Sequence, residues 1–118
     1  MSVQHAFSHE SLDVYRLAVS VNRWFAKARF PRGRANLRDQ GQRAIDSVVC
    51  NIAEGACKSG DSRRNALRIA LGEAGECCAV LDCVALPGSE EQQRNLRRIG
   101  AMLSKLAGGP RWSASGRI

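Results

Sequence analysis

Helical periodicity without any two-residue alternation is the feature that most constrains this sequence. Apolar residues recur three and four positions apart in four long stretches, a spacing that places them on one face of an α-helix. Strict alternation of apolar and polar residues, which would indicate strands, is missing. Gly and Pro cluster between the periodic stretches, where they end helices. The sequence therefore predicts an all-α chain of four helices.

The four predicted helices span residues 10–29, 36–55, 62–85 and 90–107. Phe30 ends the first helix, because a residue that precedes proline, here Pro31, disfavours the helical backbone. Gly55 is expected to end the second helix, with an extension to Cys57 as the alternative. Short connections between helices of this length favour antiparallel neighbours, and hence an antiparallel up-down-up-down four-helix bundle.

Each predicted helix carries one apolar stripe that should face the core. The stripe residues are Leu12, Tyr15, Ala18 or Val19, Asn22 and Phe25; Leu37, Gly41, Ala44, Ile45, Val48 and Ile52; Ala66, Ile69 or Ala70, Ala74, Cys77, Leu81 and Val84; and Leu96, Ile99, Leu103 and Leu106. Ser8 or Ser11 is expected to cap the first helix, and Asp61 or Ser62 the third. Small residues that suit a close approach between helices are Gly72, Ala74 and Gly75.

One domain is expected, because 118 residues leave little room for two. The predicted divisions are an N-terminal arm, 1–9, a four-helix bundle domain, 10–107, and a flexible C-terminal tail, 108–118. No apolar run approaches the roughly 18 residues of a membrane span. No secretory signal is recognised at the N-terminus either. We therefore expect a cytoplasmic protein without membrane contact.

The five cysteines fit neither a disulfide framework nor a zinc site. They are Cys50, Cys57, Cys77, Cys78 and Cys83. Their odd number argues against paired disulfides, and no C-x2-C spacing is present. The favoured interpretation is small buried helix residues in a reducing compartment. Metal or redox roles are the alternative, including a thiol-dependent sensor that uses Cys77 and Cys78.

The positive charge points to a polyanion as partner. The formal net charge is +7, and fifteen of the eighteen cations are arginines. Candidate nucleic-acid-binding residues form three groups: Lys27, Arg29, Arg32, Arg34 and Arg38; Arg63, Arg64 and Arg68; and Arg94, Arg97 and Arg98. In an antiparallel bundle the first two groups lie at opposite poles. Arginine can clamp phosphate through two hydrogen bonds, although most charge runs are only solvated surface.

Binding of RNA or DNA should be independent of base sequence, because neither a helix-turn-helix motif nor an aromatic stacking platform is recognised. Phe25 is expected in the core. Trp24 is interpreted as a contact to another subunit or to a partner. Trp112, in the tail, either anchors a partner or remains disordered.

No catalytic constellation is recognised. His5 and His9 lie near the N-terminus, and Glu54, Glu73 and Glu76 have no histidine at the spacing of a metal pair. The prediction is a protein that is not an enzyme and has neither metal nor cofactor.

The segment Gln40–Gly55, QGQRAIDSVVCNIAEG, resembles the signature of the four-helix-bundle protein family, also called the 23S ribosomal RNA intervening-sequence or S23 family. Matching signature residues are Gln40, Arg43, Ala44, Ser47, Asn51, Ile52, Ala53, Glu54 and Gly55. Further landmarks in the family's order are Leu12-Asp13-Val14-Tyr15, Phe30-Pro31 and Ile69-Ala70-Leu71-Gly72 with Glu76. The resemblance covers residues 8–107. The chain departs from the pattern at Gly41, where Leu is usual, at Val49, where Pro is usual, and at Glu73, where Ser is usual.

The resemblance implies a left-handed bundle that assembles as a homopentameric barrel around a central channel. It also implies a relation to the accessory variability protein of diversity-generating retroelements, a basic pentamer that binds nucleic acid and a reverse transcriptase. Five copies of a +7 chain would carry about +35 formally, which would attract polyanions at low salt.

Asn51 and Glu54, three residues apart, share a helix face. One interpretation makes them a recognition or channel-lining pair. The favoured one is structural: Asn51 bonds a neighbouring helix or subunit, and Glu54 pairs with an arginine, with Arg43 and Arg64 as candidates.

Two functional hypotheses follow from the sequence. The first is a non-enzymatic, homopentameric nucleic-acid-binding accessory or scaffold protein, with a reverse transcriptase as a further partner. The alternative is a structural or protein-interaction module of the intervening-sequence family whose positive charge serves no nucleic acid.

Overall fold

The computed structural model describes residues 6–108, and all its regular elements are helices. A short 3-10 helix, η1 (Ser8–Ser11), precedes the α-helices α1 (Asp13–Lys27), α2 (Ala35–Ala56), α3 (Gly60–Cys83) and α4 (Ser89–Leu106). Residues 6–108 contain no strand. The all-α class and the number of long helices are therefore confirmed. Most of the predicted arm and tail lies outside the described residues.

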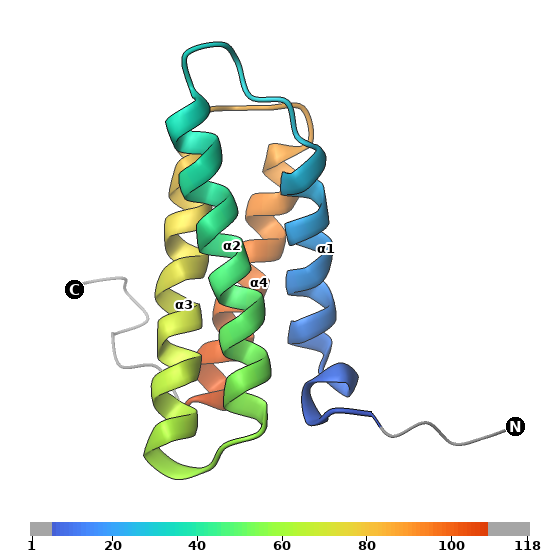
Figure 1. Cartoon of the computed structure of the whole chain (residues 1–118), viewed down its shortest axis with the longest axis vertical. Coiled ribbons are helices and arrows are strands. Elements are labelled where there is room, and N and C mark those ends of the chain that lie inside the picture. Colours follow the sequence, from blue (N-terminus) through green and yellow to red (C-terminus); the bar gives the residue numbers. More distant parts are fainter. Residues whose placement is uncertain (1–5, 109–118) are drawn as a thin grey trace, which may run out of the picture.

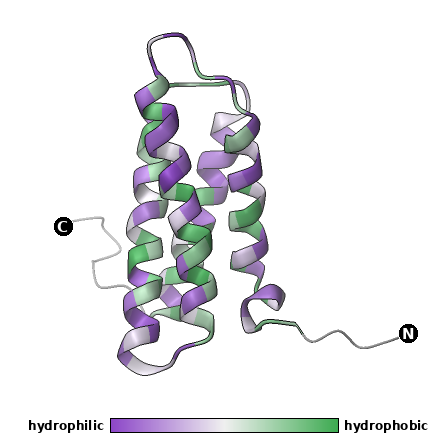
Figure 2. Ribbon diagram, viewed as in Figure 1, coloured by the Kyte–Doolittle hydropathy of each residue, from purple (hydrophilic) through white to green (hydrophobic). Residues whose placement is uncertain are grey.

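The four long helices lie side by side (Figure 1). The α1–α2 and α3–α4 loops lie at one end of the molecule, and the α2–α3 turn lies at the other (Figure 1). α2 and α3 form the most extensive pairing, and α3 with α4, α1 with α2 and α1 with α4 also pack together. Hydrophobic and hydrophilic bands alternate along each helix (Figure 2), as expected of helices that bury one face.

The core face of α1 matches the prediction only in part: Ala18 and Phe25 are buried as expected, whereas the other predicted stripe residues are not. Its buried residues are Val14, Ala18, Val21 and Phe25. Of the predicted stripe, Leu12, Tyr15, Val19 and Asn22 are only half-buried. Two apolar stripes run next to each other on this helix, and the one with the smaller side chains turns inward. Tyr15, Val19 and Asn22 of the other stripe line a groove between α1 and α2, whereas Leu12 lies beside α4.

The ends of α1 and α3 also differ from the prediction. Leu12 is extended, with ψ at 129°, so that α1 begins at Asp13, after the 3-10 turn. Ala28 is extended with ψ at 142°, and α1 therefore ends at Lys27, before the Phe30-Pro31 step is reached. The helix α3 begins at Gly60. Neither α1 nor α3 has a side-chain hydrogen bond at its N-cap, so the four predicted capping residues do not cap them.

The predicted core face of α2 is confirmed, apart from Leu37, which is half-buried. Gly55, however, does not end this helix, which continues to Ala56. A Cβ atom at Gly55 would lie 3.0 Å from Leu67 Cδ2 and 3.4 Å from Ala66 Cβ. The missing side chain thus lets α3 approach α2 just before the turn. Gly55 acts through close contact rather than as a helix breaker.

The core faces of α3 and α4 largely follow their predicted stripes. Ala70 is the buried member of the Ile69/Ala70 alternative, and Ile69 is 43% exposed. Leu67 and Val80 are buried although they were not predicted, and Leu106 is half-buried. The core of α4 includes polar residues: Gln92 and Gln93 are both buried.

The small residues Gly72 and Gly75 do not mediate a close helix approach within the chain. A Cβ atom at either position would meet nothing within 4 Å. Only Ala74, of the three small residues predicted for this role, is buried. The prediction was wrong because α3 turns this part of its surface toward open space.

Gly41 leaves a recess in the surface of α2 that the aromatic ring of Phe25 fills. A Cβ atom there would lie 2.6 Å from Phe25 Cε1 and 3.2 Å from Val80 Cγ1. Real side chains do not approach this closely, so the Phe25 ring occupies the space that a larger residue would fill. The fully buried Phe25 thereby touches the backbone of α2 and links α1 to the α2–α3 pair.

The close contact between Gly41 and the Phe25 ring predicts that Gly41→Ala destabilises the protein. Overpacking should lower the free energy of unfolding by about 1–3 kcal/mol, offset in part by the roughly 1 kcal/mol that alanine gains over glycine in a helix. In a Phe25→Leu background the same change should cost less, because the ring is gone. Urea unfolding of the four proteins of this double-mutant cycle measures the coupling. If Gly41→Ala lowers the free energy of unfolding equally with and without the Phe25 ring, the proposed contact between the two residues is wrong.

Candidate nucleic-acid interface

Five of the predicted cations surround one end of the molecule, which we call the basic end: Lys27, Arg29, Arg32, Arg34 and Arg38. They come from the last turn of α1, the α1–α2 loop and the first turn of α2, and all five are exposed. The loop residues stay in water because a loop backbone cannot satisfy its polar groups in a core. The fold thus gathers these charges at the tip of two helices.

Two of the five cations already have partners. Arg38 forms an ion pair with Asp39, with 3.2 Å between Arg38 Nη2 and Asp39 Oδ1. Arg34 Nη2 donates to the carbonyl oxygen of Cys83 over 3.4 Å. This carbonyl belongs to the last residue of α3, where the helix dipole favours a positive charge. Within residues 6–108, no ion pair engages the remaining three.

The second predicted group lies around the start of α3, at the opposite end of the molecule, and is largely engaged in the fold. Arg63 Nη1 donates to the carbonyl oxygen of Gly55 over 3.3 Å. This carbonyl lies in the last turn of α2, where it also accepts from the backbone N–H of Lys58 over 3.2 Å. Arg64 pairs with Asp61. Arg63, Arg64 and Arg68 are all half-buried, so they offer less charge to a ligand than the basic end does.

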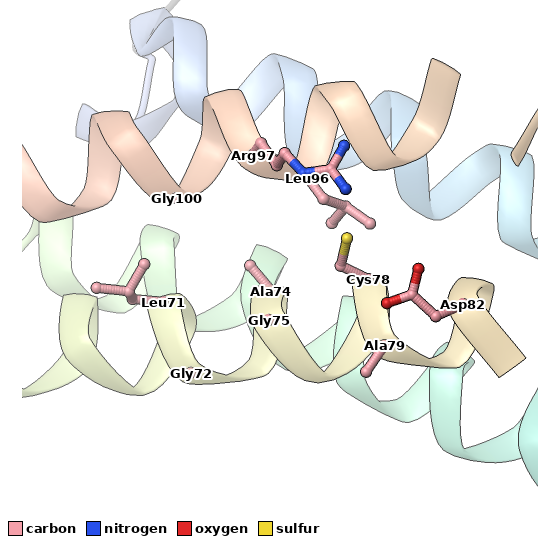
Figure 3. Close-up of a pocket in the computed structure, with 10 residues that line it drawn as sticks. All are labelled: Leu71, Gly72, Ala74, Gly75, Cys78, Ala79, Asp82, Leu96, Arg97 and Gly100. Atoms are coloured by element: carbon pink, nitrogen blue, oxygen red, sulfur yellow. The ribbon is translucent and has the colours of Figure 1, made fainter. Parts of the chain in front are cut away.

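The third predicted group, Arg94, Arg97 and Arg98, lies exposed on α4. Arg97 lines a groove of about 450 Å³ between α3 and α4. In Figure 3, Leu96 and Arg97 from α4 face Cys78 and Asp82 from α3 across this groove. The open surfaces of Gly72 and Gly75 line its other part.

The two polar signature residues form contacts within their own helix. Asn51 Nδ2 donates to the carbonyl oxygen and to Oγ of Ser47, over 2.9 and 3.0 Å. Glu54 Oε2 lies 2.6 Å from Lys58 Nζ, and this hydrogen bond raises the pKa of Lys58. Within the described residues Asn51 thus bonds its own helix and not a neighbouring one, and Glu54 pairs with a lysine instead of the expected arginine.

The apolar signature residues serve packing. Ile52 is fully buried, Ala53 is half-buried, and Gly55 holds the contact with α3 described above. Together with the local bonds of Asn51 and Glu54, these positions make the signature a packing element of α2 in the isolated chain.

The cysteines divide into two classes, and the expectation that all are buried is wrong for three. Cys50, Cys57 and Cys83 are exposed, whereas Cys77 is buried and Cys78 is half-buried. Burial raises the pKa of the Cys77 thiol well above its usual range. Burial also raises the pKa of Cys78, although the charge of Arg97 opposes this. Since the thiolate is the reactive form, these shifts disfavour a sensor based on Cys77 and Cys78.

A second groove, of about 460 Å³, lies between α1 and α2 and was not found from the sequence. Its lining residues are Tyr15, Val19, Asn22, Arg23, Asp46, Val49 and Cys50. Asn22 Nδ2 donates to Asp46 Oδ1 over 2.7 Å and links the two helices. Because each helix packs on its neighbours in ring order, the α1–α2 and α3–α4 grooves lie on opposite faces. The half-buried stripe of α1 is the signal in the sequence, but its apolar spacing predicts core instead of a groove.

Residues 6–108 hold no group of three His, Cys, Asp or Glu side chains that could bind a metal ion. None of the described helices combines the length and the apolar character that crossing a membrane requires.

Fold and surface together define the class: a small basic protein of four helices, with its signature helix packed between α1 and α3. The family model described as 23S rRNA-intervening sequence protein matches residues 10–105. The match covers most of the chain, and the chain belongs to this family. The resemblance predicted from Gln40–Gly55 is thereby confirmed. No curated protein matches the chain.

The two cysteine classes predict a selective pattern of alkylation. In the native protein at neutral pH, iodoacetamide should modify Cys50, Cys57 and Cys83 well before Cys77 and Cys78. Mass spectrometry of peptides from quenched samples measures the rates. The denatured chain, in which all five thiols are exposed, is the control. Rapid native labelling of Cys77 would contradict its burial.

The arginine contacts predict that the two ends respond differently to charge removal. Arg63→Gln should lower the free energy of unfolding by about 0.5–1.5 kcal/mol, because the Gly55 carbonyl loses a charged donor. Arg32→Gln should change it by no more than about 0.5 kcal/mol, as is usual for a surface substitution. Urea denaturation compares them. Equal effects would show that the Arg63 contact is unimportant in solution.

Proposed function

We propose that this protein is a non-enzymatic accessory or scaffold protein of the cytoplasm that binds the phosphates of RNA or DNA at its basic end. The observation that carries the proposal is the group Lys27, Arg29 and Arg32. These exposed cations share one end of the molecule, and no ion pair within residues 6–108 neutralises them. Arginine is suited to bidentate contact with phosphate, and lysine supplies a point charge.

The affinity would come mainly from release of counterions from the nucleic acid. Each neutralised phosphate releases condensed ions, so binding weakens as salt rises. The net charge of +7 adds a long-range attraction that increases the rate of encounter. A reverse transcriptase, as in the retroelement branch of the family, is a further partner within this proposal.

We further propose that the chain is an up-down-up-down bundle that assembles as a homopentamer. The positions of the loops support this helix order, because two lie at one end and the turn lies at the other (Figure 1). The two grooves on opposite faces support a ring. Contact between two different surfaces of identical chains repeats, and it closes into a ring when the rotation permits. In such a ring, the basic ends of the five chains would be arranged around one axis.

A second candidate is a protein-interaction module. The α3–α4 groove favours it, since its lining is largely apolar around Leu71, Leu96 and the open glycines. Under this alternative the groove would bind a protein and the basic end would bind nothing.

Fluorescence anisotropy with labelled single-stranded RNA tests the proposed function. Binding by nuclease-treated protein should weaken steeply as salt increases. The variant Lys27→Gln/Arg29→Gln/Arg32→Gln should bind at least tenfold more weakly, with a slope of log K against log salt shallower by up to about 3 per subunit.

The matched control removes three exposed cations that belong to none of the predicted groups and line neither groove, in Arg16→Gln/Arg43→Gln/Lys105→Gln. Its affinity should fall by less than threefold. Equal losses in the two variants would mean that net charge alone binds RNA. Absence of binding at low salt would overturn the proposal in favour of the interaction module.

Native mass spectrometry tests the assembly. We expect a species of five chains, each of 12.8 kDa. Introducing Gly75→Glu into the α3–α4 groove should dissociate it, because a charge would be buried without a partner. The surface change Arg43→Gln should leave it intact. A monomer in the wild-type protein would contradict the pentamer.

A further inference from the structure

The basic end contains a small cavity next to its cations. The cavity measures about 260 Å³ and is lined by Trp24, Lys27, Ala28, Arg29, Leu86 and Pro87. Trp24 and Lys27 lie three residues apart on α1 and therefore share a face of the helix. Leu86 and Pro87 come from the α3–α4 loop, about sixty residues later in the chain. The fold thus places an indole ring, two apolar side chains and two cations around one hollow.

The indole ring of Trp24 is held along one edge and remains half-exposed. Its centroid lies 5.3 Å from that of Phe25, with the rings 80° apart in an edge-to-face contact. At Gly88, where φ is +86°, a Cβ atom would lie 3.2 Å from Trp24 Nε1. Glycine therefore lets the α3–α4 loop pass close to the edge of the ring. A ring fixed in this way loses little further entropy when a ligand stacks on it.

The size and chemistry of the cavity suit one planar ring with a phosphate beside it. The volume lies below the roughly 300–1,000 Å³ of sites that enclose a drug-sized ligand. Every nucleobase offers a face that can stack on an aromatic side chain. Lys27 and Arg29, both exposed, stand where the phosphates that flank such a base could be neutralised.

We propose that the Trp24 cavity binds one unpaired nucleobase of single-stranded RNA or DNA, with adjacent phosphates on Lys27 and Arg29. This inference rests on the proposed function and makes it specific for single strands, because the bases of a duplex interior are already stacked and paired. It also revises the expectation that an aromatic stacking platform is missing. Trp24 stands alone in the sequence, and only the distant Leu86-Pro87 loop turns it into one wall of a cavity.

The chain offers an internal reporter for this test. It contains two tryptophans, Trp24 and Trp112, so that Trp112→Phe leaves Trp24 as the sole tryptophan. This variant is titrated with a single-stranded oligodeoxynucleotide and with an abasic strand of equal length, which keeps the phosphates and removes the bases. The intact strand should quench Trp24 emission and bind at least fivefold more tightly. The abasic strand should bind without quenching.

Substitution of the ring separates stacking from charge. Trp24→Leu should lose at least fivefold in affinity for the intact strand and little for the abasic strand. Trp24→Phe, which keeps an aromatic face, should lose less. Circular dichroism and unfolding curves verify that both variants fold, and Trp112→Phe serves as the matched control. A perfectly paired hairpin should compete less well than a single strand of the same charge.

The outcomes distinguish this inference from the proposed function. If intact and abasic strands bind equally and Trp24 emission stays constant, the cavity does not take a base, although the phosphate-binding function stands. If neither strand binds at low salt, the proposed function fails and the cavity proposal fails with it. If Trp24→Leu weakens both strands equally, the tryptophan acts through the fold, and the cavity proposal is overturned.

Discussion

The close packing of α2 against its neighbours is the constraint on which the rest of the structure depends. Two positions without side chains permit it, since Gly41 leaves room for the ring of Phe25, and Gly55 leaves room for Leu67. A core with few aromatic residues gains much of its contact area from such close approaches, because dispersion forces fall off steeply with distance. The Phe25 ring also joins α1 to α2 and α3, and so brings the end of α1 beside the two loops that form the basic end.

Arginine groups that look alike in the sequence have different physical roles. Arg63 and Arg34 each donate to a backbone carbonyl in the last turn of a helix, where the helix dipole favours a positive charge. Lys27, Arg29 and Arg32 are exposed instead, and within residues 6–108 no such acceptor engages them. The distinction depends on which carbonyl lies within reach, and this follows from how the helices end against one another.

The regions proposed to bind a partner are surfaces that helix packing leaves exposed. The family places this chain among the 23S rRNA-intervening sequence proteins, and its signature residues pack and bond within or near α2. Their contacts account for the helix rather than for a ligand. The basic end, the Trp24 cavity and the two grooves on opposite faces are therefore the regions where recognition and assembly can occur. The basic end and the cavity share Lys27 and Arg29, whereas the grooves are lined by other residues.

Periodicity alone determined that the chain forms four helices, and it found the core faces of α2, α3 and α4, because one dominant apolar stripe on each must leave water. Composition and spacing also located the arginine groups, and the signature identified the family. Only the tertiary structure decided between the two adjacent stripes of α1, between Ile69 and Ala70, and between open and contacted glycines. It alone brought Trp24 beside Leu86 and Pro87. The physical reason is that helicity is a local property of the backbone, whereas burial depends on the shape of residues that lie far away in the sequence.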